Sequence, residues 1–156
     1  MQPTPTIGLF GTCGNSIWRD AFVEAYTKRK INFFNPLKEG WSPEDALVEA
    51  EHLISDELIL FPVTSETFGV GSLAEIGFSI ISAIQGAPGR QVLVLIDKQV
   101  SAELKLSNPV AAKDSNNCRA LVRAHLAKLD LPYVEVVDTL AQLLARSLVV
   151  YDQLKK

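Results

Sequence analysis

The sequence predicts an α/β fold with a doubly wound, five-stranded parallel sheet in the flavodoxin-like order 2-1-3-4-5, forming a single domain over residues 1–156. Short apolar runs alternate with longer segments of helical periodicity, which is the pattern of repeated strand–helix–strand units. The runs Leu58–Val63 and Gln91–Ile96 are almost uniformly apolar, as expected for parallel strands buried on both faces. The length of 156 residues suits one domain with a sizeable core.

Local signals place the elements in chain order. The expected strands are residues 6–11, 31–34, 58–63, 91–96 and 133–137. The expected helices are residues 16–30, a helix starting at Ser42, and residues 72–85, 119–129 and 139–154. The buried stripes expected on the first two helices are Ile17, Ala21, Phe22 and Ala25, and then Ala46, Leu47, Ala50, Leu53 and Ile54.

Helix boundaries are indicated by capping residues. Ser42 followed by Pro43 is a typical helix start. The last helix is capped by Thr139 with Gln142 completing a capping box, or alternatively by Asp138. The polar residues 98–117 predict a long connection, a kind of segment that is usually functional or disordered.

Composition narrows the possible partners. A net charge of −3 and a pI of about 5.4 argue against a nucleic-acid backbone or an anionic membrane as the main partner. The first residues lack the features of a signal peptide and no apolar run reaches the length of a membrane span, so a cytoplasmic location is expected. Cys13 and Cys118 imply no disulfide framework. His52 and His125 lie in predicted helices without enough neighbouring ligands for zinc, so we expect neither a metal nor another cofactor.

The segment from Gly71 to Gly77 is the strongest functional signal. It places Glu75 in the first turn of a predicted helix, just past the carboxyl end of a buried strand, which is the edge where α/β sheets bind ligands. Gly69 and Gly71 allow a substrate to approach the backbone there. A helix N-terminus favours an ionised carboxylate, so Glu75 is a candidate nucleophile.

The same residues allow two other interpretations. Ser72 and Glu75 have the spacing of a capping box, in which Glu75 only accepts a hydrogen bond from the Ser72 backbone. Residues 69–74 also fit the dinucleotide fingerprint G-x-G-x-x-A, with Asp97 as the later acid. That fingerprint should follow its strand directly, whereas here several residues separate Val63 from Gly69.

Four segments together resemble the nucleoside 2-deoxyribosyltransferase family. They are residues 7–14 (IGLFGTCG), residues 33–36 (FFNP) with Trp41, residues 55–62 (SDELILFP) and residues 71–78 (GSLAEIGF). Their order and spacing cover about the first half of the chain. The resemblance implies transfer of a 2-deoxyribosyl group between nucleobases with net retention, through a covalent ester on Glu75. The implied partners are 2′-deoxynucleosides and free purine or pyrimidine bases.

The resemblance also implies further site residues. Better-known members have an aspartate where this chain has Gly69, and a first-strand tyrosine where it has Leu9 beside Phe10. A second family aspartate corresponds best to Glu49, with Asp45, Glu51 and Glu66 as alternatives for the family's acids. The expected substrate-binding residues in the same chain are Phe10, Gly11, Asn35, Trp41, Phe68, Gly71 and Ser72.

The family completes its site with an asparagine from a neighbouring subunit, which implies a homo-oligomer with shared active sites. Asn108 is the nearest candidate, and Asn116 and Asn117 are alternatives. Two other functions stay open: an N-glycoside hydrolase acting on nucleosides or their 5′-monophosphates, and a non-enzymatic binding module. A phosphate site normally uses arginines, and Arg19 is the only arginine near the first loop.

Overall fold

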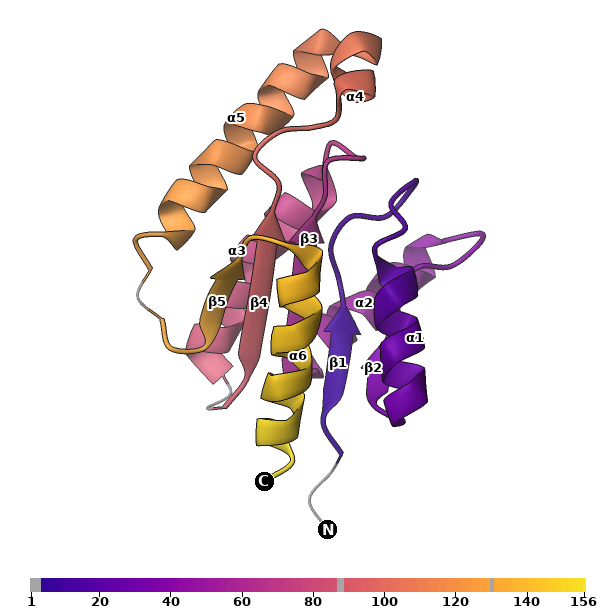
Figure 1. The fold of residues 1–156 in the computed structure, drawn as a ribbon, viewed down its shortest axis with the longest axis vertical. Helices are drawn as coiled ribbons and strands as arrows, with labels where there is room; N and C mark the ends of the chain where they lie inside the picture. Colours follow the sequence, from indigo (N-terminus) through magenta and orange to yellow (C-terminus); the bar gives the residue numbers. More distant parts are fainter. Residues whose placement is uncertain (1–3, 87–88, 130) are drawn as a thin grey trace.

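The computed structural model describes residues 4–86, 89–129 and 131–156 (Figure 1). All five strands are parallel and lie in the order β2-β1-β3-β4-β5, which confirms the predicted fold class and strand order. The strands are β1 (Thr6–Leu9), β2 (Asn32–Phe34), β3 (Leu58–Val63), β4 (Gln91–Ile96) and β5 (Val134–Val137). Strands β3 and β4 have the predicted bounds, and the other three are one or two residues shorter.

Strand β3 is the centre of the sheet. Every one of its residues is buried, and it pairs with β1 through Ile7↔Leu58 and with β4 along its whole length. Strand β2 lies on one side of β1, and β3, β4 and β5 lie on the other side. The order in which strands are added to the sheet therefore switches sides between β1 and β3. The loops after these two strands therefore face each other at the carboxyl edge.

Helices cover both faces of the sheet (Figure 1). Helices α1 (Arg19–Arg29) and α6 (Leu140–Leu154) pack on one face, with Phe22, Tyr26 and Leu143 in their core. The other face is covered by α2 (Pro43–Ser55), α3 (Val70–Gly86) and α5 (Pro109–Leu126), with Ile76 and Leu126 in the second core. The short helix α4 (Ala102–Ser107) and the start of α5 project beyond the carboxyl edge. None of the helices in the described part of the chain is long and apolar enough to cross a membrane.

Two predicted helix starts are confirmed. Ser42 caps α2, and its backbone N–H donates to the Asp45 carboxylate at 2.9 Å. Thr139 caps α6, where its side chain accepts from the backbone N–H of Gln142 at 3.1 Å. The Asp138 alternative is wrong, because Asp138 instead donates its backbone N–H to the Gln142 side chain.

The expectation of a long connection over residues 98–117 is wrong, because this stretch forms α4 and the first half of α5. Ser101 and Asn108 cap the two helices, and Pro109 occupies the first position of α5. The buried face of α5 is marked by Ala112, Ser115, Arg119 and Leu126. Since two of these residues are polar, the apolar periodicity that normally identifies a helix is weak there.

The expected buried stripes are also partly wrong. Helix α1 begins at Arg19 rather than at residue 16, so Ile17 lies outside it and is 76% exposed. Helix α2 has no buried residue in this chain, and its apolar side chains Leu47 and Ile54 are 74% and 67% exposed. Of the expected stripe on α2, only Leu53 packs against the core of this face, where it is half-buried.

Candidate active site

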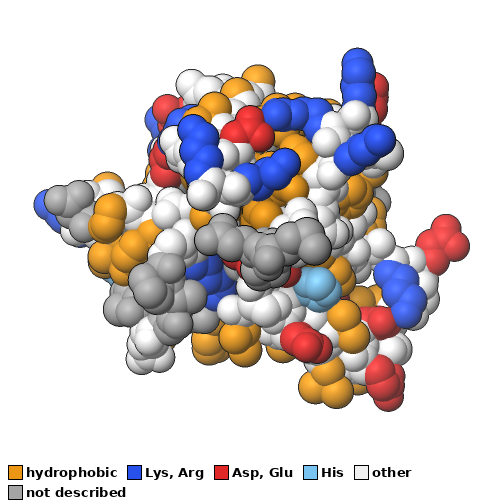
Figure 2. Space-filling model, turned by 90° about the horizontal axis from the view of Figure 1, so that it is seen from below, with side chains coloured by type: hydrophobic (Ala, Val, Ile, Leu, Met, Phe, Trp, Pro, Cys, Tyr) orange, Lys and Arg blue, Asp and Glu red, His pale blue; other side chains and the backbone are white. Residues whose placement is uncertain are grey.

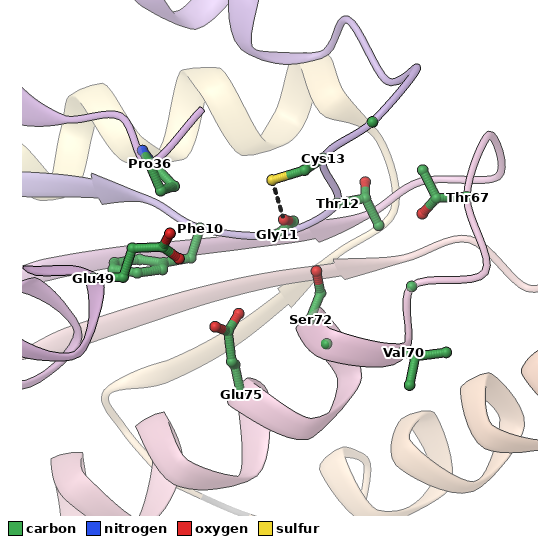
Figure 3. A pocket seen from close by; sticks show the side chains of 13 residues that line it. Phe10, Gly11, Thr12, Cys13, Pro36, Glu49, Thr67, Val70, Ser72 and Glu75 are labelled. Atoms are coloured by element: carbon green, nitrogen blue, oxygen red, sulfur yellow. Dashed lines mark hydrogen bonds between the residues drawn. The ribbon is translucent and has the colours of Figure 1, made fainter. Parts of the chain in front are cut away.

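A cavity of about 370 Å³ lies at the carboxyl edge where the β1 and β3 loops face each other (Figure 3). Its wall comes from the loops after β1 and β3, from the start of α3, from one residue after β2 and from one residue of α2. The lining residues are Phe10, Gly11, Thr12, Cys13, Gly14, Pro36, Glu49, Thr67, Gly69, Val70, Gly71, Ser72 and Glu75. Most of the site residues predicted from the sequence therefore lie together at this switch point.

Glu75 reaches the cavity from the second turn of α3, because that helix begins at Val70 and not at Ser72 as expected. Ser72 is therefore a helical residue and not an N-cap, so the capping-box interpretation of Glu75 is wrong. Partial burial, followed by the nearby negative charge of Glu49, raises the pKa of Glu75, while Arg19 opposes this shift. The pKa of Glu75 thus shifts in the direction opposite to the one that a helix N-terminus alone would produce, because desolvation and Glu49 outweigh the opposing charge of Arg19.

Glu49 projects from α2 toward the same cavity (Figure 3). Its Oε1 accepts a hydrogen bond from Trp41 Nε1 at 2.7 Å, which fixes the carboxylate at the cavity edge. The alternative acids lie elsewhere: Asp45 pairs with Lys38 at 2.8 Å, and Glu66 accepts from Ser16 at 3.4 Å. Among the four acids considered for this role, only Glu49 lines the cavity together with Glu75.

Arg19 lies beneath the first loop and is 1% exposed. Its guanidinium donates to the backbone carbonyls of Leu9 at 3.1 Å, Gly11 at 3.2 Å and Thr12 at 2.7 Å. It therefore holds the loop that carries part of the cavity wall and adds a positive charge near Glu75. Sequence reasoning missed this role, although the spacing of Arg19 to Phe22 and Tyr26 places it on the buried face of α1.

The backbone of the first loop is fixed by close packing. Gly11 has φ +104°, and a Cβ at this position would lie 2.5 Å from the carbonyl oxygen of Pro62. Next to it, the hydroxyls of Thr12 and Thr64 are 2.7 Å apart, and those of Ser16 and Thr64 are 2.8 Å apart. These contacts join the β1 and β3 loops, and no periodic pattern in the sequence indicates them.

The predicted site residues divide into two groups. Those that line the cavity are Phe10, Gly11, Glu49, Gly71, Ser72 and Glu75. Trp41 lines an adjoining hollow between α2 and α3 that also contains Glu49 and Glu75, and Phe68 lines another hollow between α3 and α5. Asn35 instead accepts from the backbone N–H of Leu37 at 3.0 Å, while its neighbour Pro36 lines the cavity.

Asn108 lies away from the cavity of its own chain. Its Oδ1 accepts from the backbone N–H of Ala111 at 3.1 Å and so caps α5. Asn116 is also engaged, because its Oδ1 accepts from the backbone N–H of Val100 at 2.9 Å. Any contact of Asn108 with an active site therefore requires a second chain.

The geometry around the cavity also bears on the dinucleotide interpretation. Within residues 4–86, 89–129 and 131–156, no three His, Cys, Asp or Glu side chains are grouped as metal ligands. The dinucleotide fingerprint would require its helix to follow the strand directly, but residues 64–69 separate Val63 from Val70. The arrangement is instead suited to chemistry that uses two carboxylates.

Comparison with known proteins gives a likeness of fold. No protein-family model and no curated protein matches this chain. Among solved structures, the chain is similar to the crystal structure of a conserved protein from Enterococcus faecalis, with 16% sequence identity and a TM-score of 0.52. That similarity covers 97% of this chain and 99% of the other. It places the chain in the α/β class with a parallel sheet, which agrees with the observed topology.

Proposed function

We propose that this chain transfers the 2-deoxyribosyl group of a 2′-deoxynucleoside to a free purine or pyrimidine base. The observation that supports this function best is the pair of carboxylates, Glu75 from α3 and Glu49 from α2, which open to one cavity at the switch point. Retaining glycosidases use such a pair, with one carboxylate as nucleophile and the other carboxyl group as acid and base. The family resemblance of the four sequence segments points to the same reaction.

In the proposed reaction Glu75 is the nucleophile. Its carboxylate attacks the anomeric carbon, the N-glycosidic bond breaks, and the bonding electrons stay on the departing base, which takes up a proton. Glu49 is suitably placed to supply that proton. A second base then attacks the ester, releases the Glu75 carboxylate and returns the proton, which gives net retention.

Two nearby carboxylates ionise together only at a cost. Burial, followed by the negative charge of Glu49, raises the pKa of Glu75, whereas the positive charge of Arg19 favours the ionised form that the proposed nucleophile needs.

We also propose that the protein is a homo-oligomer with shared active sites. Helices α2 and α3 expose large apolar side chains, among them Leu47, Ile54, Phe78 and Ile81. Seen from the end where the strands begin, many Lys and Arg side chains gather in the upper part of the view, and hydrophobic side chains appear both between them and at the lower edge (Figure 2). A second copy packed on the exposed faces of α2 and α3 would bury these residues.

The decisive experiment is incubation with a deoxynucleoside, with and without an acceptor base. Without acceptor, the first base should be released in a burst of about one equivalent per site, and mass spectrometry should find the deoxyribosyl adduct on the peptide containing Glu75. With acceptor, a new β-nucleoside should form. An α-configured product, or release of base with no adduct, would contradict double displacement.

Competition between substrates separates transfer from nucleotide hydrolysis. The arginine closest to the first loop, Arg19, already donates to three backbone carbonyls, which makes it a poor ligand for a phosphate. Deoxynucleosides should therefore be used in preference to deoxynucleoside 5′-monophosphates and to ribonucleosides. A strong preference for the monophosphate would favour the hydrolase instead. A wild-type protein that binds the nucleoside without turnover, and a Glu75→Gln variant that binds it equally well, would leave only a binding module.

A further inference from the structure

Arg119 on α5 is completely buried, with 0% exposure, and it contacts the loop after β3 that forms part of the cavity wall. Its guanidinium donates to four backbone carbonyls: Val63 at 3.0 Å, Thr64 at 2.9 Å, Thr67 at 2.7 Å and Asp97 at 3.1 Å. A buried charge is costly unless it is fully hydrogen-bonded, so this set of acceptors is a specific arrangement and not an incidental contact.

These carbonyls belong to the parts of the chain that lead to the cavity. Val63 ends β3, Asp97 follows β4, and Thr64 and Thr67 belong to the loop of residues 64–69 that connects β3 to α3. Thr67 and Gly69 of this loop line the cavity. Arg119 therefore ties the loop to the ends of two central strands.

Ser115, one turn earlier on α5, extends the same contact. Its hydroxyl accepts from Arg119 Nε at 3.1 Å and donates to the carbonyl of Phe68 at 2.7 Å. Directly after Phe68, Gly69 has φ +66° and lies so close to the core that a Cβ there would be 2.7 Å from Val63 Cγ1. Hydrogen bonds thus hold the loop backbone at Thr64, Thr67 and Phe68, and close packing restricts Gly69 immediately before α3 begins.

The start of α3 depends on this loop. The carbonyl of Gly69 accepts from the backbone N–H of Leu73 at 2.9 Å, which forms the first turn of the helix. Glu75 lies in the next turn. A displacement of the loop would therefore move the helix start and the Glu75 carboxylate with it.

We propose that Arg119, together with Ser115, is the positioning residue of this site, which orients Glu75 for attack by fixing loop 64–69 from α5. This inference rests on the proposed function, because it concerns the orientation of the proposed nucleophile. Misplacement of a reacting group by about 1 Å is enough to reduce a rate on the order of a hundredfold.

Arg123 provides a matched control. It lies one turn further along α5, and its guanidinium also donates to a strand carbonyl, that of Ile96 at 2.6 Å. The described residues show no hydrogen bond from Arg123 to loop 64–69. Arg119→Met and Arg123→Met therefore both remove an arginine from the same helix, but only Arg119→Met releases the loop.

The test compares Arg119→Met, Ser115→Ala and Arg123→Met by three measurements. Hydrogen exchange of residues 64–73 should rise by about tenfold or more in Arg119→Met, since a hydrogen bond from a charged donor is worth at least that factor. The kcat for transfer should fall by about a hundredfold with a smaller change in KM. The NMR titration of the Glu75 carboxyl should move toward its ordinary range as the loop opens to water. Ser115→Ala should change all three in the same direction but less, and Arg123→Met should change none of them.

Two outcomes would overturn the proposal. One is that Arg119→Met and Arg123→Met lower stability equally while loop exchange and the Glu75 titration stay as in the wild type. The other, if Arg119→Met does not fold, is a Ser115→Ala protein with unchanged exchange, titration and kcat. A wild-type protein without transferase activity would defeat the proposed function alone, because the exchange and titration measurements still decide whether Arg119 positions Glu75.

Discussion

At the scale of single residues, the candidate site combines buried arginines with carboxylates that line the cavity. Arg19 and Arg119 are buried beneath the two loops of the switch point, and each donates to backbone carbonyls. Glu75 and Glu49 lie above them at the cavity. The buried arginines determine where the loop backbone lies, and the two carboxylates supply the chemical groups.

The raised pKa of Glu75 predicts a pH-dependent effect on stability. The folded protein holds the Glu75 proton more tightly than the unfolded chain, whose pKa is near 4.5, so this contribution to stability is complete below pH 4.5 and is lost as the pH rises through the folded-state pKa. Glu75→Gln cannot ionise and should therefore melt at a higher temperature than the wild type at pH 7, with the difference disappearing near pH 4. Thermal unfolding at both pH values tests this, with the exposed Glu51→Gln as the control. A difference that grows toward acidic pH would contradict the burial of Glu75.

Glu49→Gln should reduce activity and change its pH dependence. Loss of a proton donor lowers kcat by about 10²–10⁴-fold. Because the negative charge of Glu49 raises the pKa of Glu75, its removal should also move the acidic limb of the rate profile to lower pH. The pH dependence of kcat measures both effects. Glu51→Gln, on the same helix but outside the cavity lining, should match the wild type. An equally large loss of activity in Glu51→Gln would mean that the effect does not come from Glu49 as a proton donor.

At the scale of elements, β3 holds the two halves of the molecule together. Leu60 is completely buried at the centre of β3, and it is paired with Leu9 and Leu93. Leu60→Ala should lower the free energy of unfolding by about 3 kcal/mol, through lost burial and the cavity that remains. Urea denaturation measures this value. Val136→Ala on the edge strand β5, where the side chain is exposed, should cost less than about 1 kcal/mol; equal losses would contradict the central position of β3.

The start of α5 allows two roles of Asn108 to be separated. Asn108→Ala should lower stability by about 1 kcal/mol because the cap is lost. Asn108→Ser retains a capping oxygen but loses the amide, so its stability should stay close to that of the wild type while its activity falls if the amide reaches a neighbouring site. A mixture of inactive Glu75→Gln and Asn108→Ser proteins should then recover part of the activity after subunit exchange. An Asn108→Ser protein with full activity would leave Asn108 as a cap only.

At the scale of the whole molecule, the apolar side formed by α2 and α3 predicts association. Ile81 on α3 is 53% exposed and does not line the cavity. Ile81→Glu should shift the protein to a monomer and reduce activity, because a charge at a buried interface is costly. Light scattering coupled to gel filtration measures the mass. Val149→Glu on α6, at the opposite face, should leave the mass unchanged, and a wild-type monomer with full activity would rule out shared sites.

Much of the fold could be predicted because its signals are local. The bounds of β3 and β4, the strand order and the caps at Ser42 and Thr139 all follow from runs of a few residues and from general rules of chain connection. Glu75 was found for the same reason, since a strand, a glycine-rich loop and an apolar helix follow one another in sequence.

The tertiary structure decided the features that depend on contacts between distant segments. The placement of Glu49 beside Glu75, and the contacts of Arg119 with Thr64 and Thr67, bring together residues far apart in the chain. The part of α5 before residue 119 was missed because polar residues such as Ser115 lie on its buried face, where hydrogen bonds satisfy them although polarity alone assigns them to the surface. The sequence by itself determined which segments become strands and helices, because hydrophobic periodicity is a local property. Only the packed chain determined which polar groups are buried and which carboxylates share a cavity, because burial is a property of the whole molecule.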